Sequence, residues 1–345
     1  MSVGFAFGVV GINHGHIYGQ VEAMLDAGCT LTKFFAPEDD LAADFVKAFP
    51  QALRVGDERE VMDDPQIKLV VGAGIPSERA PMAIRAMQAG KDVMVDKPGC
   101  TTFEQLAELR KVQAETGRIF SILYSEHYTQ RSTVAAVDLV RQGAIGKVIQ
   151  TTGLGPHRLG NYPRPDWFWD PDRSGAILVD IASHQFEQFL SITGATSARI
   201  LHSVETNFDN PEHPEFLDYG HAVIEAGGTT GFIRVDWFTP DGSPAWGDGR
   251  LFITGTEGVI ELRKYMDVEG RAGGDHLFLT DAKGTRYVDC SATPLPYGAA
   301  LRDDVNNRTE TAMSQSHCFY AMQLALEAHA QAVRLIGNRP QGATS

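Results

Sequence analysis

Cysteine is scarce in this chain, and so are the features that attach a protein to a membrane. The four cysteines, Cys29, Cys100, Cys290 and Cys318, stand far apart and form no C-x-x-C pair. This spacing argues against a disulfide framework or a zinc ribbon, and it fits a reducing cytoplasm. The N-terminal run MSVGFAFGVVG has no basic segment or cleavage site and is too short to span a bilayer. We therefore expect a cytoplasmic protein without a membrane partner.

Runs of basic residues are also missing. The 345 residues include 30 Lys and Arg against 44 Asp and Glu, which gives a net charge of −14. Nucleic acids and anionic membranes require clustered basic side chains that neutralise phosphates, so we expect neither as a partner. The length exceeds that of most single domains and 43% of the residues are hydrophobic, which predicts two globular domains with ample cores.

The first third of the chain alternates between strand and helix patterns. Residues 5–10 form a short apolar run typical of a buried parallel strand, and apolar side chains at helical spacing follow over 17–27. A second strand is expected over 29–36, which completes a βαβ unit. Further strands are expected at IKLVVGAG, KDVMVDKPG and RIFSILYS, with helices over 77–89 and 103–116 between them. The pattern predicts a doubly wound parallel sheet, whose ligands bind at the carboxyl ends of the strands.

The turn after the first strand, GINHGH, departs from the G-x-G-x-x-G fingerprint of dinucleotide-binding domains. Gly11 keeps a glycine position, whereas Asn13 and His16 replace the other two glycines. Asn13 can still make the turn, because Asn adopts left-handed conformations more readily than most residues. A metal site at His14 and His16 would need further ligands, and the sequence shows none nearby at metal spacing. We therefore predict no metal site and a phosphate cradle whose backbone amides run from Ile12 to His14.

A second group of polar residues lies in SGAILVDIASHQFEQFL. Asp180 and His184 are four residues apart there, so on a helix they would share one face. They could form a surface pair. The apolar residues around them predict burial instead, and a buried carboxylate and imidazole need partners, which favours a functional site.

In this order and spacing, the segments resemble the Gfo/Idh/MocA family, the glucose-fructose oxidoreductase and inositol dehydrogenase group. The resemblance rests on the glycine-bearing turn, on the sequence DKP at 96–98 where the family has Glu-Lys-Pro, and on the D-x-x-x-H motif. It implies a Rossmann domain over 1–125. It also implies a substrate-binding and oligomerisation domain over 126–345, an α+β unit with a large, mostly antiparallel sheet that forms a homodimer or homotetramer.

The same resemblance implies an NAD(P)-dependent dehydrogenase or reductase that acts on CH–OH groups of a sugar or polyol. His184 would be the general acid/base and Asp180 would orient it, while Lys97 would hydrogen-bond the reacting oxygen. Asp96 would lie near the nicotinamide ribose. The strand end from Gly74 to Pro76 would complete the cofactor site.

The choice between NAD and NADP depends on the end of the second strand. Relatives often place an acidic residue there to bind the adenosine ribose, but this chain has Ala36. Three acidic residues follow closely, Glu38, Asp39 and Asp40, and these would repel the additional phosphate of NADP. We therefore favour NAD, and NADP is the alternative.

The substrate is expected to contact GLGPHRLGNYPRPDWFWDP, residues 153–171, which mixes polar and aromatic side chains suited to a sugar or polyol. The candidates are His157, Tyr162 and Trp167, together with His127, which stands where relatives commonly have arginine. The aromatic residues could instead pack the junction between the domains. Three alternatives stay open for the function: a non-catalytic dinucleotide-binding regulator, a redox-assisted glycosidase, and a reductase of a keto or imine group.

Overall fold

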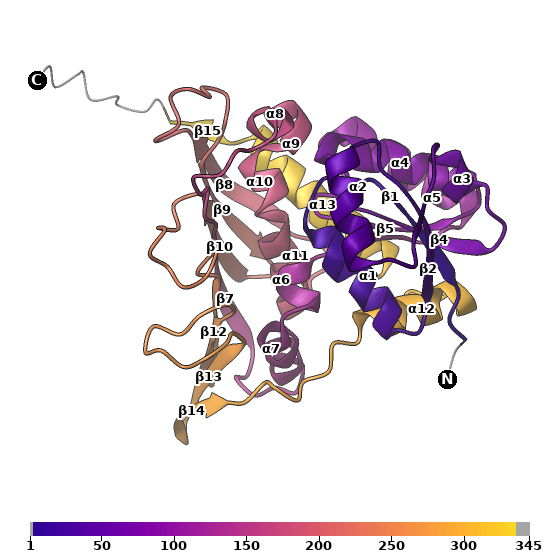
Figure 1. Cartoon of the computed structure of the whole chain (residues 1–345). Helices are drawn as coiled ribbons and strands as arrows, with labels where there is room; N and C mark the ends of the chain where they lie inside the picture. The colour runs from indigo at the N-terminus through magenta and orange to yellow at the C-terminus, as the bar shows by residue number, and fades with distance from the viewer. Residues whose placement is uncertain (1–2, 336–345) are drawn as a thin grey trace, which may run out of the picture.

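The protein is built around two sheets that lie side by side. The structure is a computed structural model that describes residues 3–335. Figure 1 shows helices around the first sheet, whereas the second sheet is seen edge-on with helices along one face. Within residues 3–335, no helix combines the length and the apolar character needed to cross a membrane.

The first sheet is parallel and has six strands in the order β3-β2-β1-β4-β5-β6. The strands are β1 (Ala6–Val10), β2 (Thr30–Phe35), β3 (Leu53–Arg54), β4 (Ile67–Gly72), β5 (Asp92–Asp96) and β6 (Phe120–Leu123). The helices between them are α1 (His16–Asp26), α2 (Asp39–Ala48), α3 (Arg59–Met62), α4 (Pro76–Gln88) and α5 (Phe103–Thr116). The predicted doubly wound sheet is confirmed. Its strand order reverses between β1 and β4, which opens the crevice where such sheets bind ligands.

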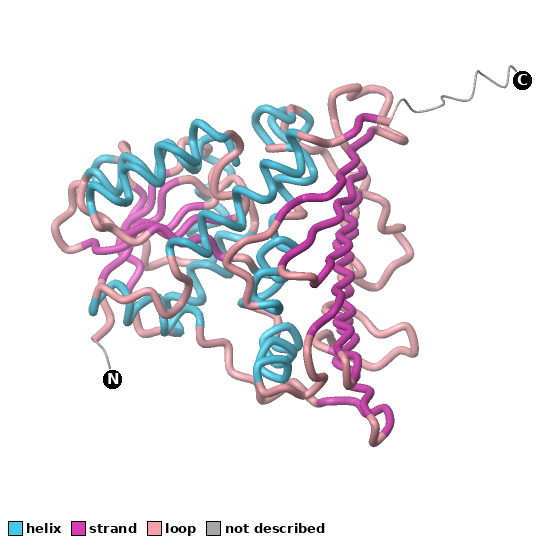
Figure 2. The backbone as a smooth tube through the Cα atoms, turned by 180° about the vertical axis from the view of Figure 1, so that it is seen from behind, coloured by secondary structure: helices cyan, strands magenta, loops and turns pink. Residues whose placement is uncertain are grey.

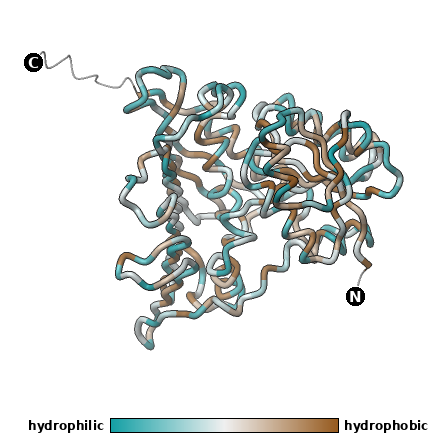
Figure 3. The backbone as a smooth tube through the Cα atoms, in the orientation of Figure 1, coloured by the Kyte–Doolittle hydropathy of each residue, from teal (hydrophilic) through white to brown (hydrophobic). Residues whose placement is uncertain are grey.

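Local sequence explains these boundaries well. The four residues from Phe7 to Val10 are buried, as expected for a strand covered on both faces. Thr102 caps α5 by accepting a hydrogen bond from the Gln105 amide, and Gly117 ends it with a left-handed φ of 61°. Figure 3 shows the hydrophobic residues concentrated in the central strands of this first sheet.

The second sheet has nine strands in the order β14-β13-β12-β11-β7-β10-β9-β8-β15. Neighbouring strands are antiparallel except for the pairs β7–β10 and β8–β15, so the expected mostly antiparallel sheet is confirmed. The strands are β7 (Val148–Pro156), β8 (Arg199–Thr206), β9 (Tyr219–Ala226), β10 (Thr229–Asp236), β11 (Arg250–Gly255), β12 (Gly258–Arg263), β13 (His276–Asp281), β14 (Gly284–Val288) and β15 (Val333–Arg334).

Helices of the second part cover only the face of this sheet that looks toward the first sheet, as Figure 2 shows from behind. They are α6 (Ser125–Tyr128), α7 (Arg131–Arg141), α8 (Asp166–Trp169), α9 (Pro171–Ser174), α10 (Ala176–Asp180), α11 (Ser183–Thr193) and α13 (Gln315–Ala330), whereas α12 (Tyr297–Asn307) packs on α1 beside the first sheet. The last helices return to the first sheet: Phe319 of α13 stacks on Phe120 of β6, with ring centroids 5.6 Å apart.

Two glycines of the second sheet let α10 and α11 approach closely. A Cβ on Gly220 would lie 2.9 Å from Ile177 of α10, and one on Gly231 would lie 2.8 Å from Phe189 of α11. Such distances are too short for a real side chain, so these positions require glycine. The close packing fixes the two helices between the sheets.

Candidate active site

The loop after β1 meets the loop after β4 at a crossing of two glycines. Gly11 has a φ of +81°, and a Cβ there would lie 2.9 Å from the Gly74 Cα, so no other residue fits without strain. The His14 amide donates a hydrogen bond to Ala73 O at 2.9 Å. This amide is therefore not free to bind a phosphate. The backbone amides of Ile12 and Asn13 are left for the predicted phosphate cradle.

A cavity of about 110 Å³ opens beside the crossing, lined among others by Gly11, Gly74, Asn13 and Glu38. Glu38 Oε1 accepts a hydrogen bond from Asn13 Nδ2 at 2.8 Å. Its Oε2 is buried and has no hydrogen-bond partner in the described part of the chain. The open space at the two glycines and this unpartnered acceptor fit the ribose and phosphate side of a dinucleotide.

Of the nine positions assigned to the cofactor, only Gly11, Asn13 and Gly74 line this cavity, and Ala36 and Pro76 are among the six that do not. Ala36 is buried directly after β2 and offers no polar side chain, so Glu38 is the acidic group that this strand end presents. Pro76 is buried at the first position of α4. Glu38 is one of the three acidic residues that the sequence analysis named after Ala36, and it lines the cavity because the chain runs on past Ala36 before it turns into α2.

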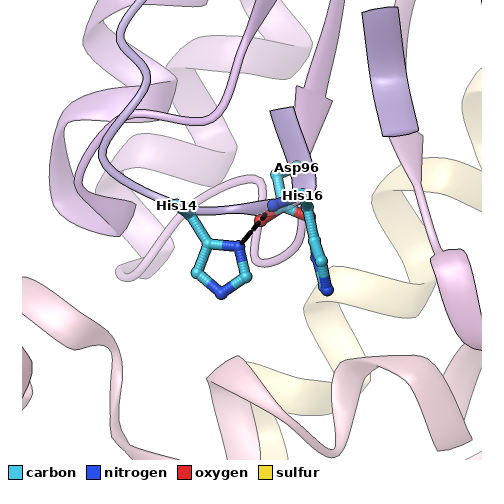
Figure 4. Close-up of side chains that lie close together, drawn as sticks. All are labelled: His14, His16 and Asp96. Atoms are coloured by element: carbon cyan, nitrogen blue, oxygen red, sulfur yellow. Dashed lines mark hydrogen bonds and ion pairs between the residues drawn. The ribbon is translucent and has the colours of Figure 1, made fainter. Parts of the chain in front are cut away.

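Both histidines of the loop turn toward Asp96 at the end of β5, as Figure 4 shows. His16 Nδ1 lies 2.9 Å from Asp96 Oδ1, and His14 Nδ1 lies 3.2 Å from Oδ2. These three groups offer ligand atoms within 4.8 Å of one another. The sequence-based reasoning that no third candidate ligand lies near the histidines was therefore wrong, because Asp96 is 80 residues away from His16 in the chain.

The charges around this cluster oppose a metal ion. Arg79 Nη2 lies 3.3 Å from Asp96 Oδ2, and both side chains are only 1% exposed. Burial alone would raise the pKa of Asp96, but the charges of His16, Arg79 and His14 hold it well below its usual range. The carboxylate is thus ionised and neutralises Arg79. A divalent cation would add two positive charges beside a desolvated guanidinium, with one carboxylate to balance them all. We interpret the cluster as a hydrogen-bond network.

Lys97 and Asp180 form the central ion pair of the site. Lys97 Nζ donates to Asp180 Oδ1 at 2.8 Å, across the gap between the strand end of β5 and helix α10. The single helix that would place Asp180 and His184 on one face does not form, because α10 ends at Asp180 and α11 begins at Ser183. Asp180 Oδ1 therefore accepts its hydrogen bond from Lys97, whereas we expected Asp180 to orient His184.

His184 lies in the first turn of α11 and is 1% exposed. Its Nδ1 atom is buried without a hydrogen-bond partner among residues 3–335. Burial lowers the pKa of His184 well below its usual range, so the ring is neutral near neutral pH. Its centroid lies 6.4 Å from the ring of His16, which connects it to the loop cluster.

A second buried ion pair lies close to His184 and was not predicted from the sequence. Lys264 Nζ lies 2.7 Å from Glu126 Oε2, and the same oxygen accepts a hydrogen bond from Gln185 Nε2 at 2.8 Å. Burial opposes ionisation of Glu126, but Lys264 and His184 lower its pKa to about 2. No local pattern signals this pair, because its partners are 138 residues apart.

The four predicted substrate residues do not gather at one place. The His157 ring packs against Trp246 at 4.5 Å, and burial lowers its pKa to about 4. Tyr162 is 57% exposed, and Trp167 packs edge-on against Phe168. His127 is buried, with Nδ1 2.9 Å from Glu187 Oε2.

A cavity of about 550 Å³ lies between the two parts of the chain instead. It is lined by Gly15, His16, Gly19, Glu22, Ala23, Asp26, Ala27, Leu123, Ser125, Tyr128, Thr129, Gln130, Trp246, Tyr265, Leu295, Tyr297, Gly298 and Ala299. Its aromatic residues come from the part of the chain after residue 125, and its histidine comes from the first part. None of the four predicted substrate residues belongs to this lining, although the His157 ring packs edge-on against Trp246, which does.

The fold and this site define a two-domain oxidoreductase with a Rossmann sheet. The family model described as an oxidoreductase family with an NAD-binding Rossmann fold, GFO/IDH/MocA, matches residues 5–124. The model of the C-terminal domain of the same family matches residues 133–261. The chain belongs to this family, as the resemblance of its motifs indicated.

Solved structures and curated relatives agree with this membership. The crystal structure of an oxidoreductase from Erwinia carotovora atroseptica is 41% identical, with a TM-score of 0.93 over 96% of this chain and 99% of that one. The NAD⁺-dependent scyllo-inositol 2-dehydrogenase of Bacillus subtilis is 27% identical over 67% of this chain and 63% of its own length. A levoglucosan dehydrogenase in complex with NADH and levoglucosan shares the fold, with 19% identity and a TM-score of 0.78 over 95% and 96% of the two chains.

Proposed function

We propose that this protein is a dehydrogenase that transfers a hydride between NAD and a hydroxyl-bearing carbon of a sugar or polyol. The observation that carries the proposal is the arrangement of three side chains between the sheets. Lys97 is held by Asp180, and a neutral, buried His184 comes from the next helix. Relatives that act on an inositol and on levoglucosan support the substrate class.

The three side chains supply what alcohol oxidation needs. The bound nicotinamide would accept the hydride. The hydroxyl oxygen must lose its proton in the same reaction, and it carries negative charge while it does so. Lys97 Nζ, positioned by Asp180, can donate a hydrogen bond to that oxygen and stabilise the charge. His184 can accept the proton, because burial keeps its ring neutral.

We further propose that Glu38 makes NAD the preferred cofactor. Its unpartnered Oε2 can accept a hydrogen bond from a ribose hydroxyl at the cavity beside Gly11. The same carboxylate would repel the 2′-phosphate of NADP at short range. This replaces the expectation that Ala36 marks the ribose contact.

The proposal is tested by fluorescence titration with NADH, followed by an absorbance screen of inositols, aldoses and anhydrosugars with NAD⁺. The variants Lys97→Met and His184→Ala should keep NADH affinity within a few-fold and lose about 10²- to 10⁴-fold in kcat. Lys111→Met is the matched control, because Lys111 is exposed on α5 and pairs with Glu108 of the same helix. Binding without turnover of any substrate would support the regulator alternative, and no NADH binding would refute the proposal.

Three coarser expectations belong to the same proposal. We retain 1–125 and 126–345 as the dinucleotide and substrate domains, and a cytoplasmic location is supported by four buried free cysteines. A homodimer or homotetramer is supported by the outer face of the second sheet, which carries no helix of residues 3–335 in Figure 2. Tyr219 and Val223 of β9 and Phe232 of β10 are partly exposed. Light scattering on the wild type and on Phe232→Asp tests this interface.

A further inference from the structure

The proposed oxidation produces a proton that the site must export. Each turnover moves one proton from the substrate hydroxyl to His184, which is only 1% exposed. The ring cannot accept a second proton until the first has reached solvent. A buried base therefore needs a partner that reaches both the base and the water outside.

His16 meets both conditions. Its ring centroid lies 6.4 Å from that of His184, a gap that one water molecule or a substrate hydroxyl can bridge. Its side chain is 34% exposed and lines the cavity of about 550 Å³ between the two parts of the chain. Imidazole is also the side chain best suited to exchanging protons near neutral pH.

Asp96 holds the His16 ring in the orientation that such an exchange requires. Oδ1 of Asp96 lies 2.9 Å from His16 Nδ1, and the carboxylate can only accept. Nδ1 therefore carries the hydrogen, which leaves the lone pair of the neutral ring on Nε2. In Figure 4 the far end of the His16 ring points away from Asp96, so this nitrogen is available.

We propose that His16, oriented by Asp96, is a relay that carries the reaction's proton between His184 and solvent. The inference rests on the proposed function. In oxidation the substrate O–H bond breaks and its proton goes to His184, while the C–H electron pair leaves as hydride to NAD⁺ and the C=O bond forms. The proton then passes from His184 to His16 Nε2 and on to water, and reduction runs through the same steps in reverse.

The other polar groups near the site are less suited to this transfer. Asp180 is partly exposed, but its Oδ1 holds Lys97, so protonating it would break the pair that stabilises the reacting oxygen. The titratable and charged groups around His16 are His14 and Asp96, with Arg79 behind Asp96, then His184 on α11, and Glu22, Asp26, Tyr128 and Tyr265 around the cavity. Among these, His16 combines a place one bridging molecule away from His184 with an orienting carboxylate and exposure to the cavity.

The decisive experiment follows NADH formation and proton release separately in single-turnover stopped flow, using absorbance and a pH-indicator dye in weak buffer. The substrate is the one identified in the NAD⁺ screen. In the wild type the two signals should coincide. In His16→Asn the side-chain amide keeps a donor for Asp96 but removes the second ring nitrogen, so proton release should lag behind NADH formation about tenfold or more. NADH affinity should change less than threefold.

Added imidazole provides the second readout. His16→Ala leaves space for a free imidazole molecule, which should restore proton release in a concentration-dependent manner. His14→Ala is the matched control, because His14 has similar exposure and contacts the same carboxylate, and it should show no rescue whatever its own activity. Coincident signals in His16→Asn, or a slow His16→Ala that imidazole does not rescue, would overturn the relay.

A third measurement needs no substrate and separates the relay from the proposed function. Nitrogen NMR of the histidine rings should show His16 in the Nδ1–H form, and a hydrogen on Nε2 of the neutral ring would overturn the relay directly. If the wild type bound no NADH, the dehydrogenase proposal itself would fail. If the wild type formed NADH but the His16 variants released protons without a lag, only the relay would fail.

Discussion

The buried pair of Glu126 and Lys264 allows a quantitative prediction. Lys264 is 1% exposed and Glu126 2%, and Nζ also donates to Gln188 Oε1 at 2.8 Å. The pKa of Glu126 falls from its usual 4.5 to about 2. A shift of this size corresponds to about 3 kcal/mol. Replacing Lys264 by Met removes the main cause of the shift and leaves a buried, unpaired carboxylate, which costs about 3–5 kcal/mol at neutral pH.

The sign of the pH dependence follows from the lowered pKa. In the wild type this group contributes stability above the unfolded-state value near 4.5, and that contribution is lost as the pH falls through about 2. In Lys264→Met the deficit should therefore be largest at neutral pH and should shrink below about pH 4, where Glu126 can be protonated without penalty. Removing both charges in Glu126→Gln/Lys264→Met should recover most of the loss, because no unpaired charge is left.

Urea unfolding at neutral and acidic pH tests these expectations, together with thermal unfolding. The single variant should lose roughly 10 °C in melting temperature, and the double variant a few degrees. Lys111→Met, an exposed lysine, controls for the loss of a lysine as such. A single variant within about 1 kcal/mol of the wild type, or a double variant as unstable as the single one, would refute the reasoning.

Three further predictions concern the Rossmann crevice. Glu38→Ser should raise kcat/KM with NADPH relative to NADH by about tenfold or more, since it removes the charge that faces the 2′-phosphate; an unchanged ratio would contradict the role of Glu38. Gly11→Ala places a Cβ 2.9 Å from the Gly74 Cα, so it should weaken NADH binding at least tenfold in a fluorescence titration. Gly15→Ala is the control: its methyl group meets open space, and the melting temperature should not change. Dialysis against EDTA should leave NADH binding unchanged. If EDTA abolished NADH binding and Zn²⁺ restored it, the charge of Arg79 would not prevent metal binding at the histidines.

The Rossmann half could be predicted closely because its signals are local. The helix expected over 103–116 is α5 to the residue, with Thr102 as its cap and Gly117 as its end. The strands expected around residues 5–10 and 29–36 differ from β1 and β2 by one residue at one or both ends. Buried parallel strands read as apolar runs, and left-handed glycines mark where helices stop, so each element carries its own evidence.

The second site motif shows where local evidence fails. A spacing of four residues predicts that Asp180 and His184 share a helix face, but the helical segment is interrupted between α10 and α11. Neither proline nor glycine stands at the interruption, in DIASH, so the sequence gives no sign of it. The break appears where α10 and α11 pack on Gly220 and Gly231 of the second sheet, and such tertiary packing overrides helix propensity.

The contact of His14 and His16 with Asp96 could not be predicted from the sequence for a different reason. Their partner, Asp96, lies at the end of a strand two places across the sheet from β1, and only the sheet order brings the two strand ends together. This also changes what Asp96 can do. The family resemblance implied a place near the nicotinamide ribose, and its two oxygens face His16, His14 and Arg79. A ribose hydroxyl would have to compete with an imidazole and a guanidinium for the same carboxylate. Asp96 therefore holds both histidines of the loop after β1, and of these three residues only His16 lines the cavity between the two sheets.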